Sequence, residues 1–235
     1  EIECLDGAYT LSPSRQRFQP ATNDGKGGNR DCLNNILTAS LLCNNAELSL
    51  SDGKHVGDPL EQALLAAAQK EGMHQKRFRA QFPRVGELAF DSTKKMMATV
   101  HAVDQGFCMY VKGAPEEVLD ACSEISPPGE GLADMPSEAQ AFWKSRTDDM
   151  AARGMRVLAV ATRQLGSPEA ADFLDLRFLG LLGLYDPPRA DVPAAIAQCR
   201  SAGIRVIMLT GDHSVTAKSI AAAVGLTDSD PKVIE

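Results

Sequence analysis

The sequence predicts an α/β protein in two parts, an antiparallel sheet flanked by helices and then an incomplete doubly wound, Rossmann-like segment. Apolar runs between residues 85 and 111, joined by a turn sequence, predict antiparallel strands. Helical patterns precede and follow these runs. Beyond residue 184, an apolar run between two helical patterns is typical of a parallel strand buried on both faces. We therefore expect one domain over residues 1–184 and part of a second over residues 185–235.

The start of the chain is expected to hold one helix. Residues 1–30 show no strong pattern, and the glycines within residues 23–29 predict a loop. Asp31 suits the cap of a helix whose apolar residues, up to Leu41, recur on one face. Asn44 and its neighbour are expected to end this helix.

The next helix carries its start signals close together. Asp58 suits the cap, Pro59 suits the first turn, and Glu61 stands where a capping box places its carboxylate. The alanine-rich stretch that follows propagates the helix to Lys70, and Gly72 is expected to stop it.

Periodicity and Gly or Pro breaks predict the remaining elements of the first part. Asp104-Gln105-Gly106 predicts a hairpin turn, and Pro115 opens a short helix that is expected to reach Cys122. Residues 126–136 are expected to form a loop, and a longer helix follows from Ser137 to about Gly154. The predicted strands are Val85–Phe90, Met96–Val103, Phe107–Val111, Met155–Thr162 and Phe178–Leu184.

The second part begins with a stiff break, because each proline fixes its own torsion and restricts its predecessor. A helix is expected over residues 191–202, followed by a buried strand over Ile204–Leu209. The turn Thr210-Gly211-Asp212 then leads into a helix that ends at Gly225. Open α/β sheets bind ligands at the carboxyl end of such a strand, and a helix N-terminus favours anions.

Composition and charge exclude several classes of function. The formal net charge is −7 and the pI about 5.2, so we expect no nucleic-acid partner and no attraction to anionic lipid. The six cysteines form no C-x-x-C pair, and no metal site is expected. No apolar run reaches the length of a membrane helix and no signal peptide is visible, so we expect no direct membrane contact.

Six short segments carry more specific information. They are Gly57-Asp58-Pro59-Leu60-Glu61, Phe90-Asp91-Ser92-Thr93-Lys94-Lys95-Met96-Met97, Lys112-Gly113-Ala114-Pro115-Glu116, Gly154-Met155-Arg156-Val157-Leu158-Ala159, Asp186-Pro187-Pro188-Arg189 and Met208-Leu209-Thr210-Gly211-Asp212. In this order they resemble the nucleotide-binding domain, the hinge and the early, haloacid-dehalogenase-type phosphorylation domain of type II, calcium-pump-like P-type ATPases. The resemblance spans about residues 30 to 225 and implies ATP as ligand, with Mg²⁺ in the full-length protein.

The resemblance implies that an aromatic and a lysine line the ATP site. Phe90 would stack on the adenine ring, and the alternative is a plain core aromatic. Lys112 would supply a point charge to the nucleotide, and the alternative is a solvated surface lysine. Gly113 would let the ligand approach the backbone closely.

Three further residues complete this implied site. The glutamate that matches Glu61 contacts the adenine amino group in the family, although its place in a capping box is an equally good explanation. Lys95 and Arg156 add positive charge, and the family's matching arginine reaches the phosphates; an exposed strand arginine is the alternative for Arg156. At Ser92 many calcium pumps carry an arginine that touches the triphosphate, so weak ATP binding is expected here.

The resemblance implies that the last two segments take part in phosphoryl transfer. Thr210, with Gly211, would help to hold the transferred phosphoryl group, and Asp212 would lie close by; a simple strand-to-helix turn is the alternative. Asp186 and Arg189 would be hinge or nucleotide-proximal residues, and a structural break explains them nearly as well. No Asp-Lys-Thr-Gly-Thr segment is present. Because phosphoryl transfer needs that aspartate, this chain is expected to be inactive alone.

The resemblance therefore implies a cytoplasmic domain of an integral membrane protein, a cation-transporting ATPase whose other domains are partners of this chain. The transported ion stays open. A soluble haloacid-dehalogenase-type phosphatase is the alternative, but no D-x-D-x-T segment supplies its nucleophile. An interaction module without nucleotide is a third hypothesis. The predicted strand within residues 185–235 lacks a neighbour, so this segment is expected either to be loosely ordered or to self-associate with a second copy.

Overall fold

The computed structural model describes residues 1–4, 7–11, 17–20, 30–48, 55–127, 131–185, 188–211 and 214–226. The contacts within the chain divide it into two compact units. The first comprises Glu1–Lys144 with Leu158–Leu182, and the second comprises Ser145–Val157 with Gly183–Glu235. The domain boundary that the sequence predicts after residue 184 stays a prediction.

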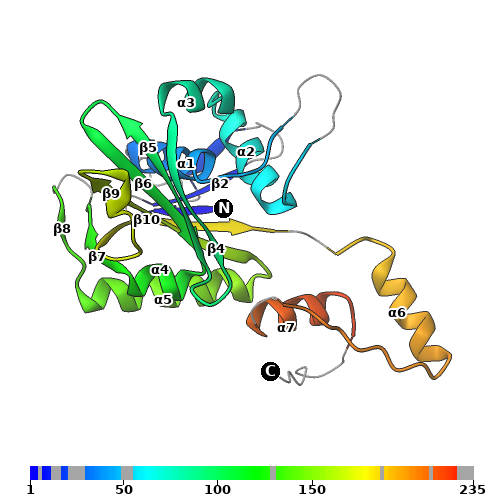
Figure 1. The fold of residues 1–235 in the computed structure, drawn as a ribbon. Helices are drawn as coiled ribbons and strands as arrows, with labels where there is room; N and C mark the ends of the chain where they lie inside the picture. The colour runs from blue at the N-terminus through cyan, green and yellow to red at the C-terminus, as the bar shows by residue number, and fades with distance from the viewer. Residues whose placement is uncertain are drawn as a thin grey trace. The chain divides into compact units, whose positions relative to one another are not determined.

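The described residues form a ten-stranded, largely antiparallel sheet in the order β3-β2-β1-β10-β9-β6-β5-β4, with β7 beside β10 and β8 beside β7 (Figure 1). This confirms the predicted α/β class and its antiparallel sheet. The strands are β1 (Ile2–Cys4), β2 (Gly7–Leu11), β3 (Phe18–Pro20), β4 (Arg84–Asp91), β5 (Met96–Val103), β6 (Gly106–Gly113), β7 (Cys122–Ile125), β8 (Ala133–Asp134), β9 (Arg156–Leu165) and β10 (Leu176–Leu184).

Helices flank this sheet on both sides. Helices α1 to α3 lie on one side, and α4 with the start of α5 lies on the other (Figure 1). The helices are α1 (Arg30–Leu42), α2 (Pro59–Lys70), α3 (Gln75–Gln81), α4 (Pro115–Asp120), α5 (Ser137–Ala152), the 3₁₀ turn η1 (Pro168–Ala170), α6 (Val192–Ser201) and α7 (Ser214–Ala223).

Each side of the sheet has its own apolar core. On one side α1 buries Leu33, Ile36 and Leu37 completely, as its periodicity predicts. On the other side the Trp143 ring of α5 packs on Phe178 of β10, with ring centroids 5.0 Å apart. Burial of such large side chains is the main source of stability in a domain of this size.

Local signals predict the start of α2 and the β5–β6 hairpin correctly. The Asp58 carboxylate accepts hydrogen bonds from the N–H groups of Leu60 (2.8 Å) and Glu61 (3.4 Å), as a helix cap does. Gly106 adopts φ +94° where the hairpin turns, a conformation that glycine reaches without steric cost.

The N-terminal residues are more ordered than the sequence predicts. Strand β1 pairs antiparallel with β10, with Ile2 opposite Leu182, and β2 and β3 extend the sheet beyond it. These strands are three to five residues long, and the partner of β1 lies about 180 positions away in the chain. Short segments of this kind give no local signal, because the distant partner decides their conformation.

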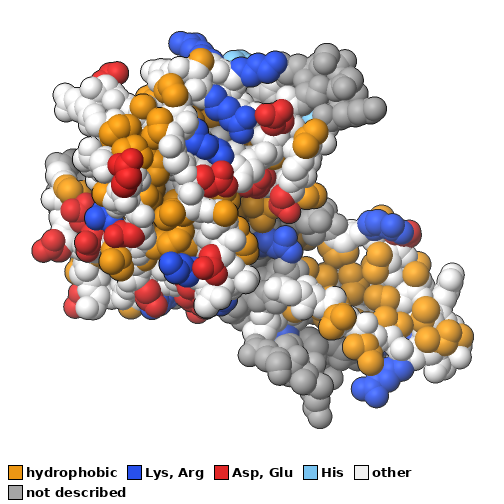
Figure 2. Space-filling model, in the orientation of Figure 1, with side chains coloured by type: hydrophobic (Ala, Val, Ile, Leu, Met, Phe, Trp, Pro, Cys, Tyr) orange, Lys and Arg blue, Asp and Glu red, His pale blue; other side chains and the backbone are white. Residues whose placement is uncertain are grey.

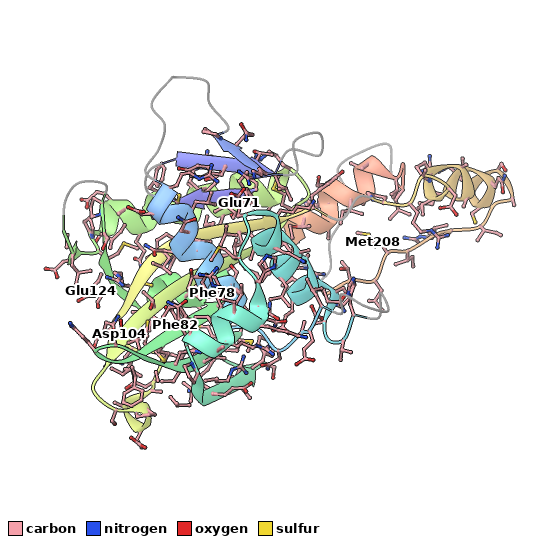
Figure 3. All side chains as sticks on the ribbon, turned by 90° about the horizontal axis from the view of Figure 1, so that it is seen from above. Glu71, Phe78, Phe82, Asp104, Glu124 and Met208 are labelled. Carbon is pink, nitrogen blue, oxygen red and sulfur yellow. The ribbon has the colours of Figure 1, made fainter. Side chains whose placement is uncertain are left out.

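Glu71, directly after α2, ties these N-terminal elements to the helices (Figure 3). Its carboxylate accepts a hydrogen bond from the N–H of Phe18 on β3 (2.7 Å) and pairs with Arg30 at the start of α1 (2.5 Å). One side chain thus links three elements that are far apart in the sequence.

One helix of the first unit was not predicted, and another ends earlier than predicted. Helix α3 follows Gly72, where no element was predicted, and it buries none of its residues. The helix that begins at Pro115 ends at Asp120, so Cys122 starts β7 instead of closing the helix. The pairing of Cys122 with Leu176 on β10 competes successfully with one more helical turn.

In the second unit, helices α6 and α7 agree with the prediction, but the strand expected between them is not formed. Residues 204–210 pair with no strand of the described chain. Apart from the half-buried Met208, their apolar side chains are exposed, with Ile207 77% and Leu209 99% exposed. Figure 2 shows apolar side chains gathered over this region, and Figure 3 shows Met208 on the extended segment after α6. An apolar run becomes a strand only when a neighbour satisfies its backbone groups.

Candidate functional site

The most buried charges of the predicted site form an ion pair. Lys112 lies on β6 between Met97 of β5 and Val160 of β9, so its strand is interior to the sheet. Its ammonium group stands 2.6 Å from the carboxylate of Glu61 on α2, and the two side chains are only 6% and 12% exposed. The alternative of a solvated surface lysine is therefore wrong.

Both oxygens of the Glu61 carboxylate are engaged in this arrangement. One contacts Lys112, and the other accepts a hydrogen bond from the N–H of Asn45 at 3.1 Å. In a capping box this carboxylate would accept a hydrogen bond from the backbone N–H of the N-cap residue, Asp58. Here it binds Lys112 and Asn45 instead. The side chain of Asn44 is fully buried and donates a hydrogen bond to the backbone carbonyl of Glu61 at 3.0 Å, which fixes the first turn of α2.

Phe90 lies near the end of β4, which is the edge strand of the sheet. Its side chain is 63% exposed, so the alternative of a core aromatic is wrong. The strand is irregular at this point, because the register with β5 shifts between Leu88 and Asp91. A bulge of this kind re-aims side chains and leaves a large apolar ring in solvent, where a ligand can stack on it.

The turn that follows Phe90 is fixed by its own hydrogen bonds. The Asp91 carboxylate accepts from the N–H groups of Thr93 (2.7 Å) and Lys94 (3.3 Å), which lowers the pKa of Asp91. Lys95 closes the turn in the left-handed region, with φ +49°. The turn therefore has a defined shape, although its side chains are exposed.

Gly113 lets this turn pack closely on the end of β6. A Cβ atom on Gly113 would lie 2.6 Å from the carbonyl oxygen of Lys95, and that same oxygen accepts a hydrogen bond from Ala114 N–H at 3.0 Å. The sequence predicted that the missing side chain makes room for a ligand. In the structure the room is taken by the backbone of the turn.

The side chain of Lys95 is also engaged. Its ammonium group lies 2.7 Å from the carboxylate of Glu117 on α4, and this partner raises the pKa of Lys95. Strand register places all of these residues at one end of the sheet, since Asp91 is opposite Met96, and Met96 is opposite Gly113. The residues that the structure brings together are Glu61, Phe90, Lys95, Lys112 and Gly113.

The other predicted residues belong to the second unit or lie outside the described residues. Arg156 is exposed at the first position of β9. Arg189 pairs with Asp191 through two contacts of 2.8 and 3.2 Å, which lower the pKa of Asp191. Thr210 and Gly211 are exposed in the segment before α7. Asp186 and Asp212 lie outside the residues that the structure describes.

A buried polar network next to Glu61 was not predicted. The Arg84 guanidinium donates to the carbonyl of Leu42 (3.1 Å) and to that of Asn44 (2.7 Å), and so completes the C-terminal end of α1. His101 faces the carbonyl of Phe82 at 2.8 Å, and burial lowers its pKa. Because these partners are 19 to 42 residues apart in the sequence, no local pattern indicates the network.

The residues that the structure describes include no cluster of three histidine, cysteine or acidic side chains that could hold a metal ion. Among the described helices, none combines the length and the apolar character that a membrane crossing requires.

Comparison with known proteins gives one family. The sequence profile described as "P-type ATPase, cytoplasmic domain N" matches residues 32–191. A calcium-transporting ATPase of Listeria monocytogenes is 32% identical over 226 residues, which cover 94% of this chain and 25% of that protein. A calcium-transporting ATPase of Bacillus cereus is 37% identical over 97% of this chain and 26% of its own length.

Relatives named for other ions match as well. A cation-transporting ATPase of Synechocystis is 40% identical over 83% of this chain and 22% of its own length. The alpha-2 subunit of the sodium/potassium-transporting ATPase of Bos taurus is 36% identical over 99% of this chain and 26% of its own length. The chain thus spans about a quarter of the length of the relatives that it matches.

Proposed function

Because the chain belongs to the P-type ATPases, through their cytoplasmic domain N, we propose that it binds ATP for a cation-transporting pump. It would present the terminal phosphate to an aspartate that this sequence does not contain. The observation that carries the proposal is the exposed Phe90 ring near the end of β4, at the sheet end where the strand register also places Lys95 and Lys112. An aromatic face with cations close by suits a base joined to phosphates.

Each residue has a proposed part in this function. Phe90 stacks on the adenine ring, while Glu61 and Lys112 form a fixed, charged wall beside it. Lys95 and Arg156 attract the phosphates.

The residues of the second unit serve the later step. Thr210, Gly211 and Asp212 hold the transferred phosphoryl group, and Asp186 and Arg189 lie at the hinge. We further propose that residues 185–235 take the doubly wound, haloacid-dehalogenase-type form when neighbouring strands are supplied, either by the pump's other domains or by a second copy.

Hydrolysis of ATP through an aspartyl phosphate and the transport of a cation are proposed for the whole protein. Mg²⁺ would neutralise phosphate charge there. We assign no magnesium ligand to the described residues, because they contain no group of three His, Cys, Asp or Glu side chains that could hold a metal ion. Relatives named for calcium and for sodium and potassium match this chain similarly, so we assign no transported ion.

We expect the chain to bind ATP weakly, with Kd about 0.1–1 mM, or about −4 to −5.5 kcal/mol. The physical reason is a single exposed aromatic and two lysines that already have carboxylate partners. NMR titration measures this directly through the signals of Phe90 and the turn after it. If these signals do not move at ATP concentrations far above this range, the proposed function is wrong.

Phe90→Ala should weaken ATP binding by about 1–3 kcal/mol, the usual cost of losing one base–aromatic stack. The fold should persist, because the ring is 63% exposed. Val85→Ala is the matched control, since Val85 is an exposed apolar residue at the other end of the same strand. Equal affinities of the two variants for ATP would exclude a stacking role for Phe90.

A further inference from the structure

The two lysine–glutamate pairs at this end of the sheet differ in how firmly they are held. In the Lys112–Glu61 pair both side chains are buried, and both Glu61 oxygens have partners. In the Lys95–Glu117 pair the lysine side chain is 54% exposed and the glutamate side chain 25% exposed. The first pair is therefore a fixed part of the fold, whereas the second is accessible to a competing anion.

Glu117 carries a second unusual feature. Its Oε2 atom is buried and has no hydrogen-bond partner, and no other side-chain nitrogen or oxygen of the described residues is in this state. A buried acceptor without a partner costs stability, and a carboxylate costs more than a neutral group. The first turn of α4 favours a negative charge at this position, and the described partner of that charge is Lys95.

The turn that carries Lys95 does not depend on Glu117 alone. Asp91 holds the backbone of the turn through two N–H groups, and the ammonium group of Lys94 lies 5.4 Å from the centre of the Phe173 ring. The side chain of Lys95 can therefore leave Glu117 while the turn keeps its place.

We propose that Glu117 competes with the nucleotide phosphates for Lys95 and thereby sets how strongly the site favours ATP over adenosine. This rests on the proposed ATP site. In the free chain Glu117 neutralises the lysine; when ATP binds, the ammonium group exchanges the carboxylate for a phosphate oxygen. Glu117 is thus a positioning residue that acts through Lys95. An ion pair whose lysine is more than half exposed is weak enough to be broken by a polyanion.

The test uses the full 235-residue chain and two ligands, ATP and adenosine. Glu117→Gln removes the charge but keeps the shape, and should tighten ATP binding about two- to five-fold, the range that corresponds to an exposed ion pair. Adenosine, which has no phosphate, should bind unchanged. Glu116→Gln is the control, because it removes the same charge from the exposed neighbouring position, which acts on Lys95 only through its charge and less than Glu117 does. In the double variant Lys95→Met/Glu117→Gln the gain for ATP should disappear.

A second readout follows Lys95 itself. In Glu117→Gln the side-chain nitrogen signal of Lys95 should titrate at lower pH than in the parent chain, because the partner that stabilises the ammonium form is gone. This titration shows whether Lys95 and Glu117 interact in solution, as the competition requires, while the comparison of ATP with adenosine separates competition from a merely structural role. If Glu117→Gln folds poorly, Glu117→Ala replaces it, since alanine suits a helix and Oε2 has no hydrogen bond to lose.

The outcomes separate this inference from the proposed function. If the parent chain binds both ligands and Glu117→Gln changes ATP affinity no more than Glu116→Gln, the competition is refuted and the ATP site stands. An equal gain for ATP and adenosine would also refute it. If the parent chain binds neither ligand, the proposed function and this inference fail together.

Discussion

Lys112→Met should lower the free energy of unfolding by about 3–5 kcal/mol, the cost of breaking a buried ion pair on one side. Methionine fills similar space, but it leaves the Glu61 carboxylate, 12% exposed, without its counter-charge. Unfolding in denaturant, followed by the fluorescence of Trp143, measures the loss. Trp143 is the single tryptophan of the chain and is buried against Phe178 in the first unit.

The double variant Lys112→Met/Glu61→Gln is the control for this prediction. Glutamine carries no charge, yet its side-chain oxygen can still accept the hydrogen bond from Asn45 N–H. Replacing both charges is often nearly neutral for stability, so we expect most of the loss to be recovered. A cost below about 1 kcal/mol for the single variant would show that the pair is solvated in solution and behaves as a surface salt bridge.

Gly180→Ala should destabilise the first unit by about 2–5 kcal/mol, because overpacking and an unfavourable torsion act together. Gly180 has φ +152°, and a Cβ atom there would clash with the carbonyl oxygen of Glu3 and lie 2.6 Å from the Ile36 side chain. The backbone of β1 cannot move away without losing its pairing with β10. Denaturant unfolding followed by Trp143 again gives the free energy.

Gly166→Ala is the matched control for the second prediction. A Cβ atom on Gly166 would meet no atom within 4 Å, so its cost should stay within about 0.5 kcal/mol. If the two alanine variants unfold at the same denaturant concentration, β1 and α1 do not pack against Gly180 as closely as described.

Elements with strong local signals could be predicted from the sequence. Asp58 and Pro59 mark the start of α2, and the turn at Gly106 marks the β5–β6 hairpin. In both cases the residues that determine the conformation lie within a few positions of one another. The burial of the apolar face of α1 and of the apolar residues of β10 was likewise predictable, because helical periodicity and apolar runs indicate buried positions.

Features that depend on distant residues could not be predicted. The Glu61–Lys112 contact joins positions 51 residues apart, and the pairing of Lys95 with Glu117 reaches a residue outside all six recognised segments. The sequence singled out Glu61, Lys95 and Lys112 as site residues, but it indicated neither pair. At Ile204–Leu209 the local pattern was misleading. The apolar run predicted a strand, but the segment pairs with no strand of the described chain.

The long-range pairing of β1 with β10 has a consequence for biosynthesis. Ile2 must wait until Leu182 has been made, which at roughly 5–20 residues per second takes about 10–40 s. During that time β4, β5 and β6 can already form their hairpins, since such pairings close in microseconds. During synthesis the strands at the β4 edge of the sheet therefore pair first. The pairing of β1 with β10, in the centre of the sheet, forms last.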